Sequence, residues 1–174
     1  MGKINNVNVA AMAEFASEIE RNSAAAKKLK SVTGRWNFEE GKPQFAAEVA
    51  YPNGSMSIET DFAPFMGGGG LRPDPVSYCM YGFASCFAGT FVAVAASEGI
   101  ELDSLEVTVE NEVDLSQPMG VAERPVTEGM SAALKVTSKA SAEELERIRT
   151  LAEERCPGVY CITNPIPFRS RIER

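Results

Sequence analysis

Four cysteines, in a chain without histidine, are the side chains best suited to chemistry. Cys86 lies inside the long uncharged stretch Pro75–Ser97, and Cys156 ends a charged segment directly before Pro157 and Gly158. The thiolate form of cysteine is a nucleophile, and two thiols can be oxidised to a disulfide and reduced again. Cys86 and Cys156 therefore favour cysteine redox chemistry.

The other two cysteines, Cys79 and Cys161, are expected to be packing residues, because cysteine is among the most frequently buried side chains. An inert, buried thiol is also the alternative for Cys86, whose neighbours include Phe83 and Phe87. Cys79 lies two helical turns from Cys86, about 10 Å along a helix axis, which is too far for a disulfide. The cysteines lack the two close pairs typical of a zinc site, so no metal is expected.

Composition and charge limit the classes of function. At 174 residues, with 44% apolar and 24% charged residues, the chain is expected to form one soluble domain, residues 1–174. Its 24 acidic and 17 basic side chains give a net charge of -7, which disfavours nucleic acid as a partner. The start of the chain lacks the pattern of a signal peptide, so we expect a reducing cytoplasm. The uncharged stretch is rich in Gly, Ala, Ser and Cys, and we interpret it as a buried helix instead of a membrane span.

Hydrophobic periodicity and turn residues predict an α+β order of elements. Asp74 and Pro75 have the residue types of a helix N-cap and first turn, and Gly99 is placed to end that helix. Ser141 and Glu144 fit a capping box at the start of a later helix. The expected elements are a helix over 9–29, strands over 32–38, 44–51 and 55–62, a helix to about Glu98, strands over 105–115 and 130–136, a helix from 141 to 156, and a short final strand over 168–173.

Three segments together resemble a known family. Pro73-Asp-Pro-Val-Ser-Tyr-Cys-Met-Tyr-Gly-Phe-Ala-Ser-Cys86 is followed by Glu154-Arg-Cys156-Pro157 and then by Asn164-Pro-Ile-Pro167. These segments, with a glycine-rich loop before the long helix, are similar to the osmotically inducible protein C and organic hydroperoxide resistance (OsmC/Ohr) family. The resemblance covers roughly residues 32 to 173.

The resemblance implies a fold and an assembly. Members of that family form intertwined homodimers in which antiparallel sheets wrap around long central helices. We accordingly expect a single OsmC-like domain with its core in residues 32–174, preceded by an additional N-terminal helical extension in residues 1–31.

The resemblance also implies roles for the cysteines. By position, Cys86 resembles the peroxidatic cysteine of the family and Cys156 the resolving one. The helix C-terminus at Cys156 disfavours a thiolate, which suits resolution better than attack. Peroxidase members use an arginine held by a glutamate, but the place of that glutamate falls here at Val76 or Ser77. The cations that remain as activators are Arg35, Lys42 and Arg72.

Two functions follow from this interpretation. The first is a cofactor-free, two-cysteine peroxidase that reduces organic hydroperoxides and is regenerated by an external dithiol. The second is a noncatalytic OsmC-like dimer that binds a small hydrophobic molecule, favoured by the missing glutamate. Tyr78, Phe83, Phe87 and Phe91 are aromatic residues available either for a substrate pocket or for a dimer core. The glycine run Gly67–Gly70 is expected to be a mobile loop, because no Gly-Lys-Ser/Thr phosphate motif follows it.

Overall fold

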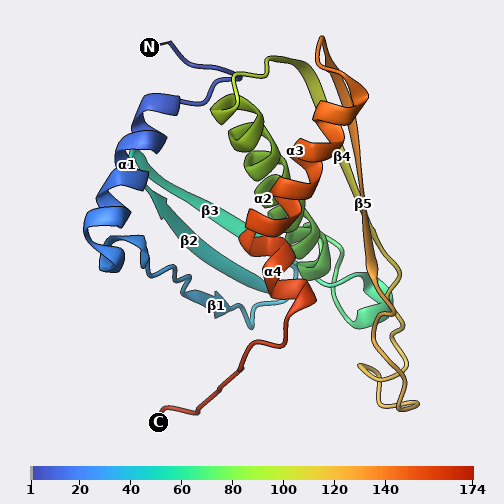
Figure 1. The fold of residues 1–174 in the computed structure, drawn as a ribbon. Helices are drawn as coiled ribbons and strands as arrows, with labels where there is room; N and C mark the ends of the chain where they lie inside the picture. The colour runs from blue at the N-terminus through green and yellow to red at the C-terminus, as the bar shows by residue number, and fades with distance from the viewer. Residues whose placement is uncertain (1) are drawn as a thin grey trace. The chain divides into compact units, whose positions relative to one another are not determined.

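A computed structural model describes residues 2–174, so Met1, with which the expected N-terminal extension begins, lies outside the described residues. Figure 1 shows the chain coloured from its N-terminus to its C-terminus. The helices and strands are α1 (Val9–Arg21), β1 (Gly34–Trp36), β2 (Phe45–Tyr51), β3 (Gly54–Thr60), α2 (Pro75–Ser97), β4 (Leu102–Asn111), β5 (Met130–Ser138), α3 (Ala142–Arg155) and α4 (Pro157–Thr163).

The chain divides into two compact units. One comprises Glu14–Tyr81, and the other comprises Gly82–Arg174 together with the N-terminal residues up to Ala13. Helix α2 contributes its first turns to the former unit and the remainder, including Cys86, to the latter.

The unit of residues 14–81 contains an antiparallel sheet in the order β1-β2-β3. A turn at Pro52 and Asn53 closes the hairpin of β2 and β3, in which Val49 lies opposite Met56. Gly34 in β1 lies under the ring of Phe45, and a Cβ at Gly34 would come within 2.1 Å of that ring. Only a glycine therefore allows β1 to pair with β2 in this register.

The glycine-rich loop after this sheet is organised by a buried carboxylate. Asp61 is 2% exposed, and its Oδ2 accepts hydrogen bonds from the backbone N–H of Gly69 at 3.1 Å and of Leu71 at 2.9 Å. Gly67 and Gly70 adopt positive φ angles of 83° and 65°, which glycine reaches without steric cost. The loop leads into α2.

Asp74 caps the start of α2, as the sequence predicts. Its Oδ1 accepts from the backbone N–H of Val76 and of Ser77, and Pro75 is the first helical residue. The helix ends at Ser97, and Gly99 follows with a φ of 73°. Both boundaries agree with the signals in the sequence.

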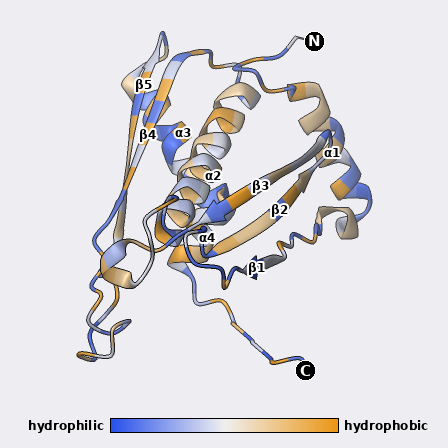
Figure 2. Cartoon of the chain, turned by 180° about the vertical axis from the view of Figure 1, so that it is seen from behind, coloured by the Kyte–Doolittle hydropathy of each residue, from blue (hydrophilic) through white to orange (hydrophobic). Residues whose placement is uncertain are grey.

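The unit containing Cys86, Cys156 and Cys161 has its core between α2, α3 and the antiparallel pair β4-β5. Residues along β4 alternate between exposed and partly buried, and Figure 2 shows the matching alternation of hydrophilic and hydrophobic bands. Just after the C-terminal end of α2, Nη1 of Arg147 in α3 donates a hydrogen bond to Oε1 of Glu98 at 2.8 Å. The core residues that are fully buried are Phe87, Phe91, Val94, Ala95, Ile148, Ala152 and Cys156.

Helix α3 begins at the predicted capping box. The Ser141 side chain accepts from the Glu144 backbone N–H, and the Glu144 carboxylate accepts from the Ser141 backbone N–H. Ile148 and Ala152 form the buried stripe of α3. The position of this first turn determines which residues of α3 point into the core, including those near its C-terminal end.

Two predicted elements differ from the structure, and one helix was not predicted. The first helix ends at Arg21 instead of reaching residue 29, because the Asn22 side chain accepts from the Ala24 N–H and starts a separate 3-10 helix. The final strand expected over 168–173 does not form, and Phe168 stays 90% exposed. Helix α4 was not predicted, because proline directly after a helical segment is typical of a helix end, although it fits a first helical turn equally well.

Helix α2 is long and apolar enough to cross a bilayer by length and composition, and it is the one such helix found in the described part of the chain. Its C-terminal half supplies core residues between Phe87 and Ala96, as a core helix does. In the single chain the first turns of α2 are partly exposed, and Tyr81 is 72% exposed.

Candidate redox site

The sulfur atoms of Cys86 and Cys156 lie 3.6 Å apart, although 70 residues separate them in the sequence. Cys86 comes from the middle of α2, and Cys156 from the junction of α3 and α4. Both thiols are free, and the two sulfurs are within hydrogen-bonding distance of each other. A disulfide requires about 2.05 Å between the sulfurs, so a small side-chain movement is enough to join them.

Cys156 owes its position to a break between two helices. Its N–H donates to Ala152 O at the end of α3, and its C=O accepts from Tyr160 N at the start of α4. Its backbone is extended, with φ -78° and ψ 119°, and Pro157 begins the new helix. The chain therefore turns at Cys156 while its 1% exposed side chain stays in the core.

Gly158 lets α4 approach α2. A Cβ built on Gly158 would lie 3.5 Å from the Cys86 Cβ, 3.5 Å from the Cys156 sulfur and 3.3 Å from the Phe83 ring. The absence of a side chain at Gly158 thus keeps the two sulfurs close together.

The surroundings of Cys86 hold its thiol in the neutral form. Burial raises the pKa of Cys86 above its ordinary value of 9.0, and the adjacent Cys156 and Cys161 sulfurs reinforce this by repelling a second negative charge. The backbone N–H of Gly158 acts in the opposite direction, because it donates to the Cys86 sulfur. Cys86 is partly buried, whereas Cys156 is buried.

Comparison with known proteins shows the family to which this chain belongs. The sequence profile of the OsmC-like proteins matches residues 67–171, which include the glycine-rich loop, α2 and all four cysteines. The chain belongs to the OsmC-like protein family. The resemblance inferred from the cysteine-containing segments is confirmed.

Solved structures share the fold of this OsmC-like chain at low sequence identity. An OsmC-like protein from Mycoplasma pneumoniae has a TM-score of 0.56 at 14% identity, covering 79% of this chain and 89% of that one. OsmC from Legionella pneumophila, an organic hydroperoxide resistance protein, has a TM-score of 0.53 at 20% identity, covering 78% and 91%. An organic hydroperoxide resistance protein from Elizabethkingia anophelis has a TM-score of 0.51 at 19% identity, covering 75% and 86%. A comparison with curated proteins gave no significant match.

The fold prediction is therefore confirmed at the level of architecture. The OsmC-like chain is an α+β protein with antiparallel sheets and a long helix, as the order of its predicted elements indicates.

Cys79 and Cys161 do not have the surroundings expected of them. Both were predicted to be packing residues, but both are exposed in this OsmC-like chain. In the described residues, no group of three or more cysteine or acidic side chains is arranged to hold a metal ion.

The residues expected to activate a thiolate have other contacts. Arg72 pairs with Glu59, and Lys42 pairs with Glu39, each at 2.7 Å. Arg35 is exposed on β1 and takes part in none of the ion pairs found among residues 2–174.

The place expected for the family's glutamate offers no carboxylate. Val76 is 43% exposed, and the Ser77 hydroxyl donates to Asp74 Oδ2 at 2.6 Å. Neither side chain can hold a guanidinium by a charge-assisted hydrogen bond.

An apolar hollow of about 610 Å³ lies in the unit of residues 14–81, between the sheet and the first turns of α2. Of the four aromatic residues proposed from the sequence, Tyr78 lines this hollow. Phe87 and Phe91 lie in the hydrophobic core of the other unit, and Phe83 stacks on Phe87. The residues lining the hollow are Val32, Phe45, Ala47, Val49, Met56, Ser57, Ile58, Thr60, Pro73, Ser77, Tyr78 and Tyr81.

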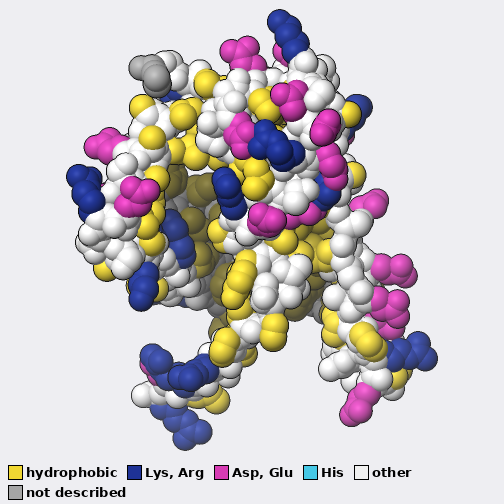
Figure 3. Space-filling model, viewed as in Figure 1, with side chains coloured by type: hydrophobic (Ala, Val, Ile, Leu, Met, Phe, Trp, Pro, Cys, Tyr) yellow, Lys and Arg dark blue, Asp and Glu magenta, His cyan; other side chains and the backbone are white. Residues whose placement is uncertain are grey.

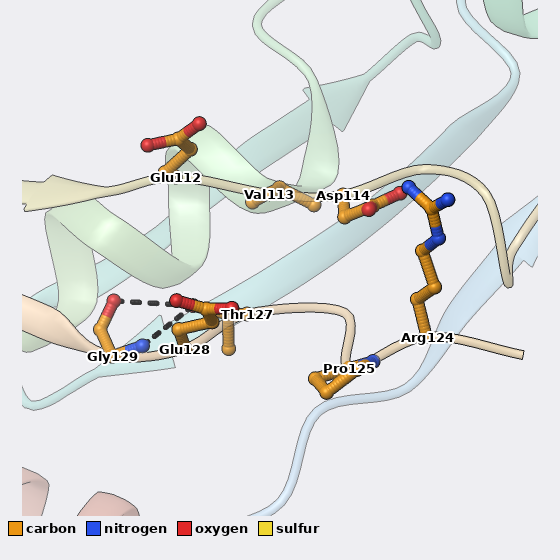
Figure 4. Close-up of a pocket in the computed structure, with 8 residues that line it drawn as sticks. All are labelled: Glu112, Val113, Asp114, Arg124, Pro125, Thr127, Glu128 and Gly129. Atoms are coloured by element: carbon orange, nitrogen blue, oxygen red, sulfur yellow. Dashed lines mark hydrogen bonds between the residues drawn. The ribbon is translucent and has the colours of Figure 1, made fainter.

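A second hollow, of about 570 Å³, lies between the end of β4 and the loop before β5, and it is polar. Figure 4 shows the Arg124 side chain extended towards Asp114, and the Thr127 hydroxyl bonded to the backbone of Gly129. No cysteine lines this hollow, so it is separate from the sulfur pair.

The surface over α3 and α4 changes in character along the chain. Figure 3 shows acidic and basic side chains mixed over α3, where Arg149 pairs with Glu146 and Glu153, and hydrophobic side chains over α4. Tyr160 and Ile162 of α4 are 58% and 49% exposed.

Proposed function

We propose that this OsmC-like protein is a cytoplasmic thiol peroxidase that reduces organic hydroperoxides without a cofactor. Cys86 is the attacking residue and Cys156 the resolving residue. The observation that carries the proposal is the 3.6 Å separation of two free sulfurs that come from different parts of the chain.

The reaction requires only these two thiols and an external dithiol. The Cys86 thiolate attacks the terminal peroxide oxygen, the O–O bond breaks, and the alkoxide takes up a proton and leaves as an alcohol. The Cys86 sulfenic acid is then attacked by the Cys156 sulfur, which forms a disulfide and releases water. Two electrons from an external dithiol restore both thiols.

The surroundings of the two sulfurs support this division of roles. Cys86 is the more accessible sulfur, and the Gly158 N–H is directed at it. Cys156 is 1% exposed, which suits a residue that reacts with a neighbouring sulfenic acid instead of with a peroxide from solvent. A peroxide therefore meets Cys86 first.

Family membership supports the substrate class. Two of the structural neighbours described above are organic hydroperoxide resistance proteins, which makes an organic hydroperoxide the first substrate to test. The raised pKa of Cys86 leaves little thiolate at neutral pH, so we expect slow turnover there.

A single-turnover experiment tests the proposal. Reduced protein is mixed with one equivalent of cumene hydroperoxide in a stopped-flow instrument, and the products are mapped by mass spectrometry. We expect a Cys86–Cys156 disulfide in the wild type, no consumption by Cys86→Ser, and normal consumption by Cys79→Ser, a matched change at another cysteine of α2. Unchanged consumption by Cys86→Ser would refute the role of Cys86.

The apolar hollow favours a second candidate function, the binding of a small hydrophobic molecule by a noncatalytic protein. Its lining is almost entirely aliphatic and aromatic, and its volume of about 610 Å³ is suitable for a small ligand. The same mapping distinguishes the two functions, because a noncatalytic protein keeps four thiols after exposure to peroxide. A binding assay with a fluorescent fatty acid tests the hollow itself. We expect the wild type to bind the probe and the Met56→Lys variant to lose that binding.

The assembly belongs to the proposal as well. We propose that the chain acts as a homodimer, with residues 32–174 as one OsmC-like core and residues 1–31 as an extension. Exposed apolar side chains on β1 and α2, such as Trp36 and Tyr81, favour a covering subunit. Light scattering coupled to gel filtration tests this, and a monomer mass at micromolar concentration would contradict it.

A further inference from the structure

Three of the four cysteines lie in one small region, and they differ in exposure. Cys156 is 1% exposed, Cys86 is partly buried, and Cys161 of α4 is exposed. The proposed catalytic cycle uses the two less exposed sulfurs and leaves Cys161 without a role.

Helical geometry places Cys161 on the side of α4 that faces Cys86. Gly158 and Cys161 are three residues apart in α4 and therefore share a face, with about 4.5 Å of rise between them. The Gly158 position faces Cys86, because a Cβ there would lie 3.5 Å from the Cys86 Cβ. The influence of Cys161 on the pKa of Cys86 is consistent with this closeness.

A disulfide between Cys86 and Cys156 would be difficult for a bulky reductant to reach. Exchange requires a thiolate to approach one sulfur along the S–S axis, so its rate depends on access. Cys156 is closed to solvent, and Cys86 is partly covered. An exposed thiol beside Cys86 can react both with the disulfide inside the protein and with a reductant at the surface. Such a thiol removes the restriction on access.

We propose, on the basis of the function above, that Cys161 is an exchange thiol through which an external dithiol reduces the Cys86–Cys156 disulfide. The Cys161 thiolate attacks the Cys86 sulfur, so that a Cys86–Cys161 bond forms, the Cys86–Cys156 bond breaks, and Cys156 leaves as a thiolate and takes up a proton.

The external dithiol completes the reduction at the surface. One of its thiolates attacks the exposed Cys161 sulfur and releases Cys86 as a thiolate. Its second thiol then attacks the mixed disulfide and releases Cys161, and the reductant leaves oxidised. Two electrons pass from the dithiol to the protein, and all three cysteines end as thiols.

The first experiment tests whether Cys161 reaches Cys86. The Cys156→Ser variant receives one equivalent of cumene hydroperoxide and is digested with chymotrypsin, and the peptides are identified by mass spectrometry. We expect a Cys86–Cys161 disulfide. A Cys86 sulfenic acid that persists and is trapped by dimedone, with Cys161 still reduced, would overturn the proposal. The test is repeated with Cys156→Ala, because the serine variant places a hydroxyl group at a buried position.

The second experiment tests the reductive step in the intact protein. Wild type, Cys161→Ser and Cys79→Ser are oxidised with cumene hydroperoxide and then reduced by thioredoxin, a protein dithiol. We expect oxidation of Cys161→Ser to be no slower than that of the wild type, and its reduction to be slowed about tenfold, because exchange depends on access to the sulfur. Cys79→Ser should match the wild type, because it changes another exposed cysteine.

The two proposals fail in different ways. Equal reduction rates in Cys161→Ser and wild type would overturn the exchange role while leaving the peroxidase intact. A wild-type protein that leaves the hydroperoxide unconsumed would refute the peroxidase, and with it the exchange role.

Discussion

Gly158 at the start of α4 lies so close to Cys86 of α2 that an added Cβ would touch the Cys86 Cβ at 3.5 Å. The same Cβ would lie 3.5 Å from the Cys156 sulfur and 3.3 Å from the Phe83 ring. This contact between the two helices keeps the sulfur pair together, so it is the first place to perturb.

Replacing Gly158 with valine should separate the two sulfurs. A branched side chain has no room between α4 and α2, and overpacking of this kind costs about 1–3 kcal/mol. We expect a lower urea midpoint and slower disulfide formation after oxidation of Cys86, measured by rapid-quench mapping. Gly158→Ala is the control with a milder effect, because the Phe83 ring needs to move by only a few tenths of an ångström. Disulfide formation at the wild-type rate in the valine variant would contradict this account.

The rate at which Cys86 reacts with hydroperoxide should rise with pH. Only the thiolate reacts, and burial raises the pKa of Cys86 above its ordinary value of 9.0, so the rate should grow about tenfold per pH unit below that pKa. Stopped-flow measurements across the neutral and alkaline range test this. In Cys156→Ser the profile should move to lower pH, because one neighbouring sulfur that raises the pKa is gone. A rate that levels off near neutral pH would show that a cation activates the thiol.

The same pKa shift predicts the sign of a stability change. The folded chain holds the Cys86 proton more tightly than the unfolded chain does, so folding gains stability from this group below the ordinary pKa. That contribution disappears as the pH rises through the raised value. Urea unfolding of wild type and Cys86→Ser at neutral and alkaline pH measures the difference, and an equal pH dependence in both proteins would contradict it.

Asp61 should be essential for the loop that precedes α2. Asp61→Ala leaves the backbone N–H groups of Gly69 and Leu71 without an acceptor, and we expect a loss of about 3 kcal/mol in the free energy of unfolding. Asp61→Asn keeps an acceptor oxygen and should lose less. Urea denaturation followed by tryptophan fluorescence reports the change, since the single Trp36 lies in the same unit. Equal losses in the two variants would exclude this hydrogen-bonding role.

The capping box of α3 should contribute to the stability of the unit that holds Cys156. Ser141→Ala removes the acceptor for the Glu144 N–H, and loss of such a cap costs about 1 kcal/mol. Ser170→Ala in the exposed C-terminal tail is the matched control and should leave the urea midpoint unchanged. A null effect of Ser141→Ala would mean that tertiary packing alone fixes the start of α3.

The sequence alone predicted much of the local structure, because its signals act over a few residues. Asp74, Pro75 and Gly99 bound α2, and Ser141 with Glu144 begins α3, as their side-chain chemistry requires. Local signals were insufficient where one residue pattern is compatible with two different structures. Pro157 fits both the end of one helix and the start of the next, and α4 was missed for that reason. The alternating tail after residue 167 forms no strand and pairs with no strand among residues 2–174.

The candidate site, like the fold, could be predicted from the sequence only in part. The types and contexts of Cys86 and Cys156 marked them as a pair, and the segments around them identified the family. Only the tertiary structure brought their sulfurs to 3.6 Å within one chain. It also placed Cys79 and Cys161 at the surface. Burial and distance depend on how α2, α3 and α4 pack across 70 residues of chain, and no local pattern of residues encodes that packing.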